Sequence, residues 1–529
     1  MLRDFIIALS LSNLCFYRAW RLLLNPAYYY FPRSRLIELA AITLNVALVA
    51  ALLFAGITLA RRSGKPLVRG LAQVAFMLAL LLPLNGLRGE SALFTRARLE
   101  ALSGKVGLLV LGVSLLLLVA FALVRWRQQM FRAAVALVLV LAPFVLITFA
   151  QGVWLALRNN PAATARTGDL SSLPHDERTT RSPRVVWILF DEFDQRLAFD
   201  ERPASVLLPE FDRLRNESFV AAQAYAAAGE TMKAVPSLLT GKLICRTKVL
   251  GPDKLRIRYQ ESGEVAEFTA EPNIFTRARD AGVRSALAGW YHPYCRLLGR
   301  SLLSCYTERA DSLAKQKLTV AGSMLQQLGE SVSPLPLVAR FVPANERLVR
   351  RTQSAEYSNL LEEAERLTSD ARVRLVLIHL PVPHPPGIYD RTKQEFSDDA
   401  QRSYLDNLAL ADRALGTLRR ALEDAGLWEE TTLLVSSDHW WRVPNVWKKE
   451  SAFWTREDAA AWSGQTNHRI PFILKLAAHA DAATYDAPFN TVLTQDLLLA
   501  VLRGELHDAP TVAAWLDRHR SIADSPCNK

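Results

Sequence analysis

Long uninterrupted runs of apolar residues dominate the first third of the chain. They cover residues 36–60, 71–87, 106–124 and 133–155, and a weaker run begins at Phe5. Each long run has about the length that an α-helix needs to cross the hydrocarbon core of a bilayer. The weaker run lacks the cleavage site of a signal peptide and leads into Arg18, Arg21 and an aromatic cluster, which is typical of a membrane interface. We therefore expect a transmembrane domain of about five helices over residues 1–155.

The pattern changes after a polar segment, residues 156–183, which is rich in Pro, Ser and Thr, lacks a helical period and therefore indicates a linker. Beyond it, short apolar runs predict buried strands at residues 185–190, 283–289, 373–380, 431–437 and 468–476. Residues 404–426 have apolar positions at helical spacing. Strands alternating with helices predict an α/β domain of the doubly wound kind, with a largely parallel central sheet, over residues 184–529.

The net charge of +11 is concentrated in the membrane part. Residues 1–154 hold 16 basic and 4 acidic residues, whereas the remainder holds 47 basic and 48 acidic residues. Juxtamembrane positive charge suits anionic lipid headgroups better than nucleic acid, so we expect no nucleic-acid partner. If the basic clusters at 61–69 and 125–132 face the cytoplasm, five spans place the C-terminal part outside it, although a third basic cluster, 88–105, falls on that outer side.

The cysteines agree with an oxidising compartment. Cys15 lies in the first apolar run, whereas Cys245, Cys295, Cys305 and Cys527 form an even set in the C-terminal part. An even set is compatible with two disulfides. We favour the pair Cys295–Cys305 because it brackets a short loop, and the alternative is four unpaired buried thiols.

Acidic residues and histidines recur at the edges of the predicted strands. They are Asp191, Glu192, His292, His384, Asp438, His439 and His468. Open parallel sheets bind ligands beyond the carboxyl ends of their strands. Any one of these residues is more often a loop residue or a cap, but four of the nine histidines gather at strand edges. The set therefore favours metal-assisted phosphoryl or sulfuryl chemistry, which needs carboxylates, imidazole and an oxygen nucleophile. We regard His379 as structural.

A candidate nucleophile, Thr231, stands in AAGETMKAVPSLLTGK, residues 227–242. The Gly-Lys ending resembles a phosphate-binding P-loop, but Pro236 and Leu243 occupy positions where that loop needs Gly and Ser or Thr. Two interpretations remain. Thr231 is the N-cap of a helix, or its hydroxyl faces a substrate, and the two are compatible because a helix N-terminus also attracts a phosphoryl group.

As an ordered series, these motifs resemble the sulfatase-like branch of the alkaline phosphatase superfamily, in the form of membrane-anchored phosphoethanolamine and phosphoglycerol transferases. The resemblance runs from about residue 185 to 480, through VVWILFDEFD, TMKAVPSLLTG, FTRARDAGVRSALAGWYH, HLPVPHPP, YLDNLALADRALGTLRRAL, SSDHWWR and NHRIPF. Sulfatases carry a modified Cys, in Cys-x-Pro-Ser-Arg, ten residues before the Gly of a Leu-Leu-Thr-Gly ending. Here Thr231 stands ten residues before Gly241, and Thr cannot become formylglycine.

The resemblance assigns roles residue by residue. It makes Thr231 the nucleophile, and it implies a divalent metal held by Asp191, Glu192, Thr231, Asp438 and His439. Zn²⁺ is the preferred metal and Mn²⁺ the alternative. The remaining three histidines, His292, His384 and His468, are expected to contact the transferred group or a second metal. Trp290 stands where sulfatases place a Lys, which removes an expected contact with the anion.

The resemblance implies a ping-pong transferase. A phospholipid donor would give its head group, of the phosphoethanolamine or phosphoglycerol type, to Thr231 and then to an envelope glycan or lipid acceptor. We expect an integral protein of the bacterial inner membrane with its catalytic domain on the periplasmic side. The alternatives are a sulfatase-like phosphodiesterase or phosphatase that uses water, and a catalytically silent envelope binding protein.

Overall fold

The computed structural model describes two compact units. The described residues are 1–25, 35–84, 125–158, 183–251, 253–308, 319–332, 345–443, 453–462, 467–478, 482–520 and 523–528, with a few single residues between them. The first unit contains helices α1 to α4, α7, α8 and α14, and the second contains the remaining described elements from β1 to the C-terminus. The predicted linker, 156–183, and the predicted span at 106–124 lie largely outside the described residues.

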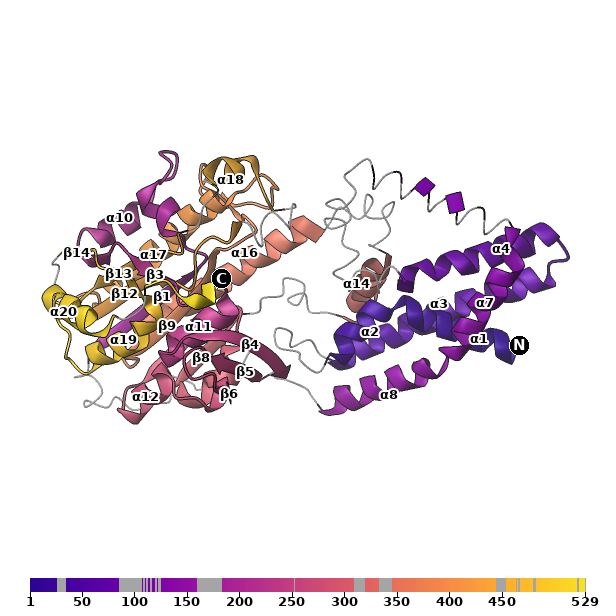
Figure 1. Ribbon diagram of the computed structural model, residues 1–529, viewed down its shortest axis with the longest axis horizontal. Helices are drawn as coiled ribbons and strands as arrows, with labels where there is room; N and C mark the ends of the chain where they lie inside the picture. Colours follow the sequence, from indigo (N-terminus) through magenta and orange to yellow (C-terminus); the bar gives the residue numbers. More distant parts are fainter. Residues whose placement is uncertain are drawn as a thin grey trace. The chain divides into compact units, whose positions relative to one another are not determined.

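The first unit is built from apolar helices (Figure 1). They are α1 (Leu2–Cys15), α2 (Tyr17–Leu24), α3 (Arg35–Arg62), α4 (Pro66–Ala79), α7 (Arg127–Val140) and α8 (Pro143–Arg158). Among the described residues, three stretches are long and apolar enough to cross a membrane, namely Leu36–Arg62, Pro66–Leu84 and Arg127–Leu157. The weak run from Phe5 forms two short consecutive helices divided at Phe16, and its role as a span stays a prediction.

A helix from the C-terminal half of the sequence also belongs to the first unit. This helix, α14 (Val320–Val332), packs on α3. Ser323 Oγ and Gln327 Nε2 donate hydrogen bonds of 3.1 and 2.9 Å to the buried Glu38 carboxylate. The Asn45 amide donates to Gln327 Oε1 at 3.0 Å. The sequence pattern assigns residues 184–529, and therefore this helix, to the α/β domain, whereas the structure assigns the helix to the first unit. Hydrogen bonds from α14 thus stabilise the buried carboxylate of Glu38.

A mixed, mostly parallel eight-stranded sheet forms the centre of the second unit. Its order is β14 (Ala483–Tyr485), β2 (Phe219–Ala221), β13 (Phe472–Lys475), β12 (Thr431–Ser437), β1 (Arg184–Asp191), β9 (Leu375–Pro383), β7 (Ser285–Gly289) and β8 (Ser304–Thr307). The strands from β12 to β8 are parallel, and β13 runs antiparallel to both of its neighbours. The α/β architecture expected from the alternating apolar pattern is confirmed.

Helices cover both faces of this sheet (Figure 1). One face carries α10 (Pro209–Arg215), α16 (Asn345–Thr368) and α17 (Tyr404–Asp424), and the other carries α11 (Thr231–Thr240), α12 (Ile274–Asp280), α19 (Thr494–Leu502) and α20 (Ala509–His519). Alternate residues of β1 point to opposite faces, so Trp187 joins one core and Ile188 the other. Every residue of β1 is buried, which explains its continuous apolar run.

Shorter elements complete the second unit. They are β3 (Ala224–Tyr225) with β15 (Phe489–Asn490), β10 (Tyr389–Asp390) with β11 (Glu395–Phe396), and the short helices α13 (Tyr294–Leu298) and α18 (Arg456–Ala461). The predicted last strand begins later than expected, because His468 has a φ of 56° and lies in the segment before β13.

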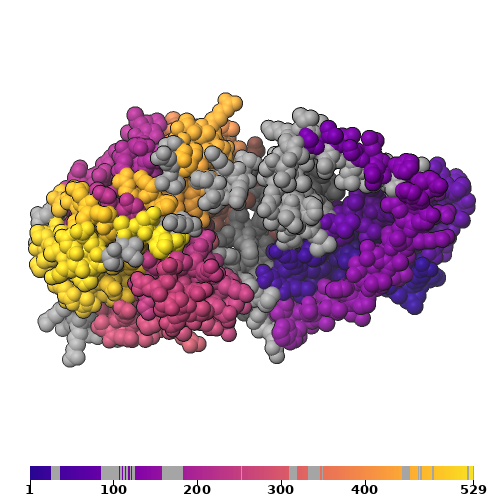
Figure 2. Space-filling view, viewed as in Figure 1, coloured from indigo at the N-terminus to yellow at the C-terminus, as the bar shows by residue number. Residues whose placement is uncertain are grey.

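Two disulfides lie in the second unit, and one of them joins α13 to the edge strand β8 of the central sheet. Cys295–Cys305 is formed, as predicted, and Cys245 pairs with Cys527. Cys245 belongs to a small antiparallel sheet, β4 (Ile244–Gly251), β5 (Lys254–Tyr259) and β6 (Val265–Glu267). In the space-filling view the C-terminal residues, in yellow, lie against this part of the chain (Figure 2). The two disulfides fit an extracytoplasmic location.

Candidate active site

Asp191 is the last residue of β1, the strand between β9 and β12 in the sheet. Its side chain is fully buried, and neither carboxylate oxygen has a hydrogen-bond partner among the described residues. The indole N–H of Trp290 lies close enough to lower the pKa of Asp191, but the two groups do not form a hydrogen bond. A buried carboxylate in this state is costly unless a cation lies beside it.

Asp438 and His439 follow β12 directly, next to the end of β1. Ser437 ties the two strand ends together, because its hydroxyl lies 2.9 Å from the Phe190 carbonyl and accepts a bond from the Phe193 N–H at 2.9 Å. Asp438 Oδ1 accepts bonds from the backbone N–H groups of Glu192 and His439 at 3.2 and 2.7 Å, whereas its Oδ2 is buried 3.3 Å from His439 Nε2. One oxygen of Asp438 therefore orients the group and the other is left for a ligand.

The structure brings Asp191, Asp438 and His439 together as a buried cluster. One possible ligand atom from each lies within 4.8 Å of the others. His439 Nδ1 lies 3.0 Å from the Trp440 carbonyl, which fixes the proton on Nδ1 and leaves the lone pair on Nε2. Two carboxylates and one imidazole nitrogen are a donor set that divalent metals accept, so the residues present fit a metal ion.

The pKa values of the cluster residues also favour the binding of a cation. Burial and repulsion from Asp438 and Glu192 raise the pKa of Asp191 well above its usual value. Burial likewise raises the pKa of Asp438 to about 7, and a hydrogen bond from Thr231 opposes that shift. Burial lowers the pKa of His439 well below 6.5, so the imidazole stays neutral. A divalent cation reverses the first two shifts and needs the neutral His439 as a ligand.

Thr231 is the first residue of α11 and borders the cluster. Its Oγ1 lies 3.2 Å from His439 Nε2, and the residue is 1% exposed. The interpretation of Thr231 as an N-cap is wrong: the cap position belongs to Glu230, whose backbone is extended and whose side chain makes no capping bond. The Thr231 hydroxyl is therefore directed to the cluster rather than to its own helix. The helix ends at Gly241, whose φ of 68° is suited to glycine.

Glu192 makes an ion pair with Arg442 beside the cluster. Arg442 Nε lies 2.8 Å from Glu192 Oε1, and the Glu192 side chain is fully buried. Glu192 has a φ of 64°, which turns the chain after β1, and Tyr404 holds the turn by donating to the Glu192 carbonyl at 2.7 Å. The carboxylate of Glu192 thus already has a cationic partner in Arg442. Its role as a further metal ligand stays a prediction.

The three other predicted histidines occupy different places. His292 is buried and its Nε2 lies 3.1 Å from the Thr231 carbonyl, and burial lowers its pKa to about 4. His384 Nδ1 lies 2.8 Å from the Pro385 carbonyl, and its ring packs edge-on to Trp290. The His468 Nδ1 lies 3.0 Å from a carboxylate oxygen of Asp524 and its ring packs on Trp440. Their contacts with a substrate stay predictions.

His379, regarded as structural, is buried and its Nδ1 lies 2.7 Å from the Tyr294 hydroxyl.

The comparison with protein families decides the affiliation of the chain. The family model described as Sulfatase matches residues 183–502, more than half of the 529 residues. The chain belongs to the sulfatase family. This sulfatase-family protein is thus an enzyme of the alkaline phosphatase superfamily that processes ester bonds, and its buried cluster has the composition of a metal site. No curated protein matches it.

Several solved structures are similar to this sulfatase-family protein. Ps i-CgsB, in complex with k-i-k-neocarrahexaose, is 14% identical, with a TM-score of 0.41 and coverage of 63% of this chain and 74% of that chain. The phosphonate monoester hydrolase of Agrobacterium radiobacter is 15% identical, with a TM-score of 0.38 and coverage of 61% and 74%. A protein of the alkaline phosphatase superfamily from Vibrio parahaemolyticus is 14% identical, with a TM-score of 0.37 and coverage of 61% and 66%. Similarities this remote carry no argument about the substrate.

Sequence reasoning missed the residues that support the site of this sulfatase-family protein. Arg442 is the clearest case, because its guanidinium faces the carboxylates of Glu192, Asp191 and Asp438. Its position three residues after His439 in SSDHWWR was the available signal. Tyr404 gave no such signal, because a Tyr at the start of a helix is ordinarily a core residue.

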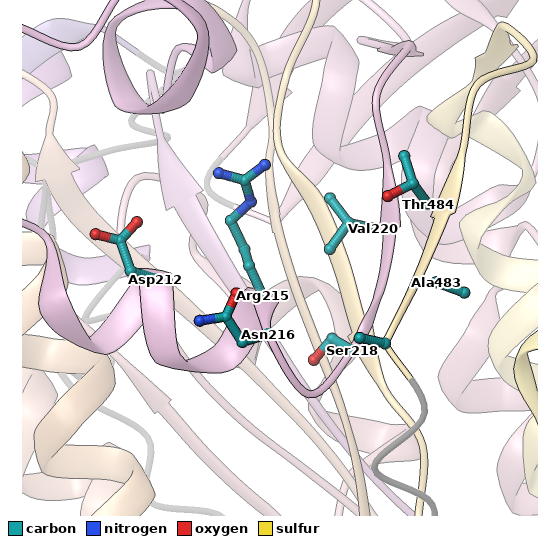
Figure 3. Close-up of a pocket in the computed structure, with 8 residues that line it drawn as sticks. Asp212, Arg215, Asn216, Ser218, Val220, Ala483 and Thr484 are labelled. Carbon is teal, nitrogen blue, oxygen red and sulfur yellow. The ribbon is translucent and has the colours of Figure 1, made fainter.

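A separate pocket, drawn in Figure 3, is lined by residues of β2 and β14 among others and has a volume of about 540 Å³. It lies towards the amino end of β12, away from Asp438. Its lining residues are Asp212, Arg215, Asn216, Ser218, Val220, Ala482, Ala483 and Thr484. The register supports this placement, since Phe472 pairs with Ser436 at the site whereas Leu474 pairs with Phe219. Figure 3 shows Arg215 between α10 and the strands that carry Val220 and Thr484. The pocket includes none of the predicted site residues.

Proposed function

We propose that this sulfatase-family enzyme transfers a phosphoryl-linked head group, of the phosphoethanolamine or phosphoglycerol type, from a phospholipid to a glycan or lipid of the cell envelope. The observation that carries the proposal is the Thr231 hydroxyl, buried beside His439 at the place where the resemblance expects the nucleophile. A Thr cannot be converted to the formylglycine of sulfatases, but its oxygen can form a phosphate ester.

The surroundings of Thr231 suit an attack on phosphorus. The N-terminus of the ten-residue helix α11 presents a positive dipole end, which favours phosphoryl oxygens. His292 holds the Thr231 carbonyl and so fixes the first turn of the helix. Arg442, which pairs with Glu192, places a positive charge beside the cluster. These groups favour a substrate with a negatively charged phosphoryl group.

Asp191, Asp438 and His439 would hold the metal, with Thr231 Oγ1 next to it. Such an ion would supply a Lewis acid that lowers the pKa of the Thr231 hydroxyl and neutralises charge on the phosphoryl oxygens. We propose Zn²⁺, which accepts carboxylate and imidazole ligands in one site, with Mn²⁺ as the alternative. His384, near Glu192 and Arg442, is the candidate to exchange protons with the leaving and attacking alcohols.

The proposed reaction has two displacements. Thr231 Oγ1 forms a bond to phosphorus, the bond from phosphorus to the diacylglycerol oxygen breaks, and the Thr231 proton ends on the diacylglycerol hydroxyl. An acceptor hydroxyl then forms the new ester bond to phosphorus, the bond from phosphorus to Thr231 Oγ1 breaks, and the acceptor's proton ends on the Thr231 hydroxyl. The apolar helices of the first unit support a lipid donor, and the two disulfides support a catalytic domain on the periplasmic side of a bacterial inner membrane.

Mass spectrometry of the peptide that contains Thr231, after exposure of the full-length protein to phosphatidylethanolamine or phosphatidylglycerol, tests the proposal. We expect a head-group phosphate ester on Thr231 in the wild type, none in Thr231→Ala, and a reduced amount in Thr231→Ser. Thr240→Ala is the matched control, because Thr240 is buried in the same helix and its hydroxyl donates to the Pro236 carbonyl at 2.8 Å, away from the cluster. An adduct that forms in Thr231→Ala as well would refute the assignment.

The competing functions predict other outcomes of the same experiment. A hydrolase that uses water would release free head-group phosphate and form no glycan or lipid product from an added acceptor. A catalytically silent binding protein would form neither adduct nor product, would contain no metal when purified, and would keep its cellular phenotype in Thr231→Ala.

A further inference from the structure

The small antiparallel sheet of β4, β5 and β6 carries basic side chains on its outer face. Side chains of β5 alternate between its two faces, and Leu255, Ile257 and Tyr259 are buried in the core. The residues of β5 that alternate with them are exposed, and the register places exposed residues of β4 opposite them. This basic face consists of five exposed side chains, namely Arg246, Lys248, Lys254, Arg256 and Arg258.

Like charges stand directly opposite one another on the basic face. Arg246 is in register with Arg258, and Lys248 with Arg256. Like charges in such cross-strand pairs are destabilising. None of the five side chains forms an ion pair within the part of the chain that the structure describes. The fold therefore carries these charges at a cost that its own contacts do not offset.

The acidic residues of this small sheet leave the basic face positive. Glu267 of β6 is in register with Arg256, whereas Asp253, Glu261 and Glu264 lie in the turns at the strand ends. Five basic residues and one acidic residue therefore leave a net charge of +4 on the outer face.

Protection of a sheet edge does not account for these charges. Lysines on edge strands commonly prevent two sheets from pairing through their backbones. Arg256 and Arg258, however, lie on β5, which is the central strand of this sheet and is hydrogen-bonded to β4 and β6. A partner with negative charge explains their position better.

The basic face is firmly attached to the core of the second unit. Its central strand is held by the buried side chains beneath it, and Cys245, the neighbour of Arg246, is linked to Cys527. β4 also follows closely after α11, the helix that begins with Thr231 (Figure 1). A partner bound to the basic face would thus be held at a fixed place relative to α11.

The spacing of the charges suits a surface with many separate anions. Side chains on one face of a strand repeat about every 6.8 Å, so Lys254, Arg256 and Arg258 extend over about 14 Å. The charges lie side by side and do not converge on one point, as they would in a pocket for a single small anion. Anionic phospholipid headgroups form such a surface, and each Lys or Arg close to it strengthens binding about fivefold.

A bilayer is also the anionic partner that this chain itself brings near. Three stretches of the first unit are long and apolar enough to cross a membrane. Because both units belong to one chain, a bilayer that holds the first unit has a high effective concentration for the second, and weak attraction is enough.

We propose that the basic face docks the second unit on the surface of the bilayer, with its Lys and Arg side chains bound to the phosphates of anionic phospholipids. The docking depends on charge and not on the reaction. That it brings Thr231 to a lipid donor rests on the proposed function. Salt should weaken it, because the Debye length falls from about 10 Å at 0.1 M to about 3 Å at 1 M.

Reductive methylation of lysines in the full-length protein, reconstituted in lipid nanodiscs, tests the proposal. Formaldehyde with a borane is an uncharged reagent, and mass spectrometry reads each lysine separately. Lys393 is the internal reference, since its side chain is 68% exposed between β10 and β11. In discs that contain phosphatidylglycerol we expect Lys248 and Lys254 to react at least about threefold more slowly, relative to Lys393, than in discs of phosphatidylcholine. We expect 1 M NaCl to remove the difference.

The double variant Arg256→Gln with Arg258→Gln is expected to weaken docking about 25-fold and to abolish this protection. It removes opposed like charges from exposed positions, so its melting temperature is expected to equal or exceed that of the wild type. Arg213→Gln with Arg420→Gln is the matched control, because these side chains are 59% and 60% exposed on α10 and α17, which pack on the other face of the central sheet. We expect the control to be protected like the wild type.

Three results would overturn the proposal. The first is equal reactivity of Lys248 and Lys254 in both kinds of disc, and the second is protection that persists in the Arg256 and Arg258 double variant. The third is protection by soluble dextran sulfate but not by phosphatidylglycerol, which would indicate an acidic glycan as the partner. Protection without an adduct on Thr231 would support the docking and contradict the transferase, and an adduct without protection would do the reverse.

Discussion

Metal affinity of the full-length protein is expected to fall steeply on mild acidification. A metal ion must replace the proton on Asp438, whose pKa burial raises to about 7. Between pH 7.5 and pH 5.5, displacement of one proton with a pKa of about 7 weakens the Kd roughly 25-fold, which corresponds to about 2 kcal/mol. Asp191, whose pKa is also raised, makes the loss larger. His439 adds nothing, because its pKa lies well below 6.5 and it is already neutral.

The measurement is a Zn²⁺ titration of chelator-stripped protein in detergent at pH 5.5 and 7.5, against a competing chromophoric chelator. Asp438→Asn is expected to lose most of the affinity together with its dependence on pH. Asp412→Asn is the matched control, because burial also raises the pKa of Asp412 to about 7 and its carboxylate accepts a bond from Phe211 away from the cluster. If the Kd of the wild type changed less than about threefold over this range, Asp438 would not be the proton-releasing ligand.

The same pKa shift predicts the stability of the metal-free protein. The folded-state pKa of Asp438 lies above its ordinary value of 3.8, so its contribution to stability is present below about pH 4 and is lost as the pH rises towards 7. The loss is on the order of 4 kcal/mol. Metal-free protein is therefore expected to resist urea better at pH 5 than at pH 7.5, and bound metal is expected to remove or reverse that order.

Three further predictions concern the scaffold around the site. Arg442→Met leaves the buried Glu192 carboxylate without its cation and is expected to cost about 3–5 kcal/mol in urea unfolding, most of which the double variant with Glu192→Gln regains; equal losses in the single and double variants would contradict this. Removal of the Cys245–Cys527 disulfide, whose sequence separation is 282, is expected to lower the free energy of unfolding by roughly 2–3 kcal/mol more than removal of Cys295–Cys305, whose separation is 10, because it closes a longer loop. Equal melting temperatures of the two double-serine variants would contradict this. Gly241→Ala places a side chain at a φ of 68° and is expected to lower stability by about 1–2 kcal/mol, which a matched Ala substitution at a glycine with negative φ would not.

The cluster at Asp191 could be predicted from sequence because it depends on two simple facts. β1 and β12 are buried on both faces, so each is a continuous apolar run whose end is visible, and parallel neighbours carry their ends to the same edge. Asp191 and Asp438 therefore converge whatever the intervening chain does. Which of Asp191 and Glu192 faces inward could not be read from the sequence, because it depends on the left-handed turn at Glu192.

The rest of the site depends on contacts between distant segments. The partner of Glu192 lies 250 positions away, at Arg442, and the neighbour of His468 is Asp524 near the C-terminus. Thr231 looked like a cap because Thr is a common N-cap, but the extended residue before the helix is Glu230. The edge strand β2, three residues long, has too little pattern to be distinguished from a loop.

The helix α14 sets a limit on where this chain can be cut. Residues 316–343 interrupt the sequence of the second unit yet belong to the first, so the chain leaves the second unit and re-enters it within one stretch. A protein truncated after the last apolar helix would keep Ser323 and Gln327 but lose Glu38 and Asn45, their hydrogen-bond partners. Such a fragment would expose an orphaned helix to water. Moving the N-terminal cut would not remove this helix, because α14 lies within the sequence of the second unit.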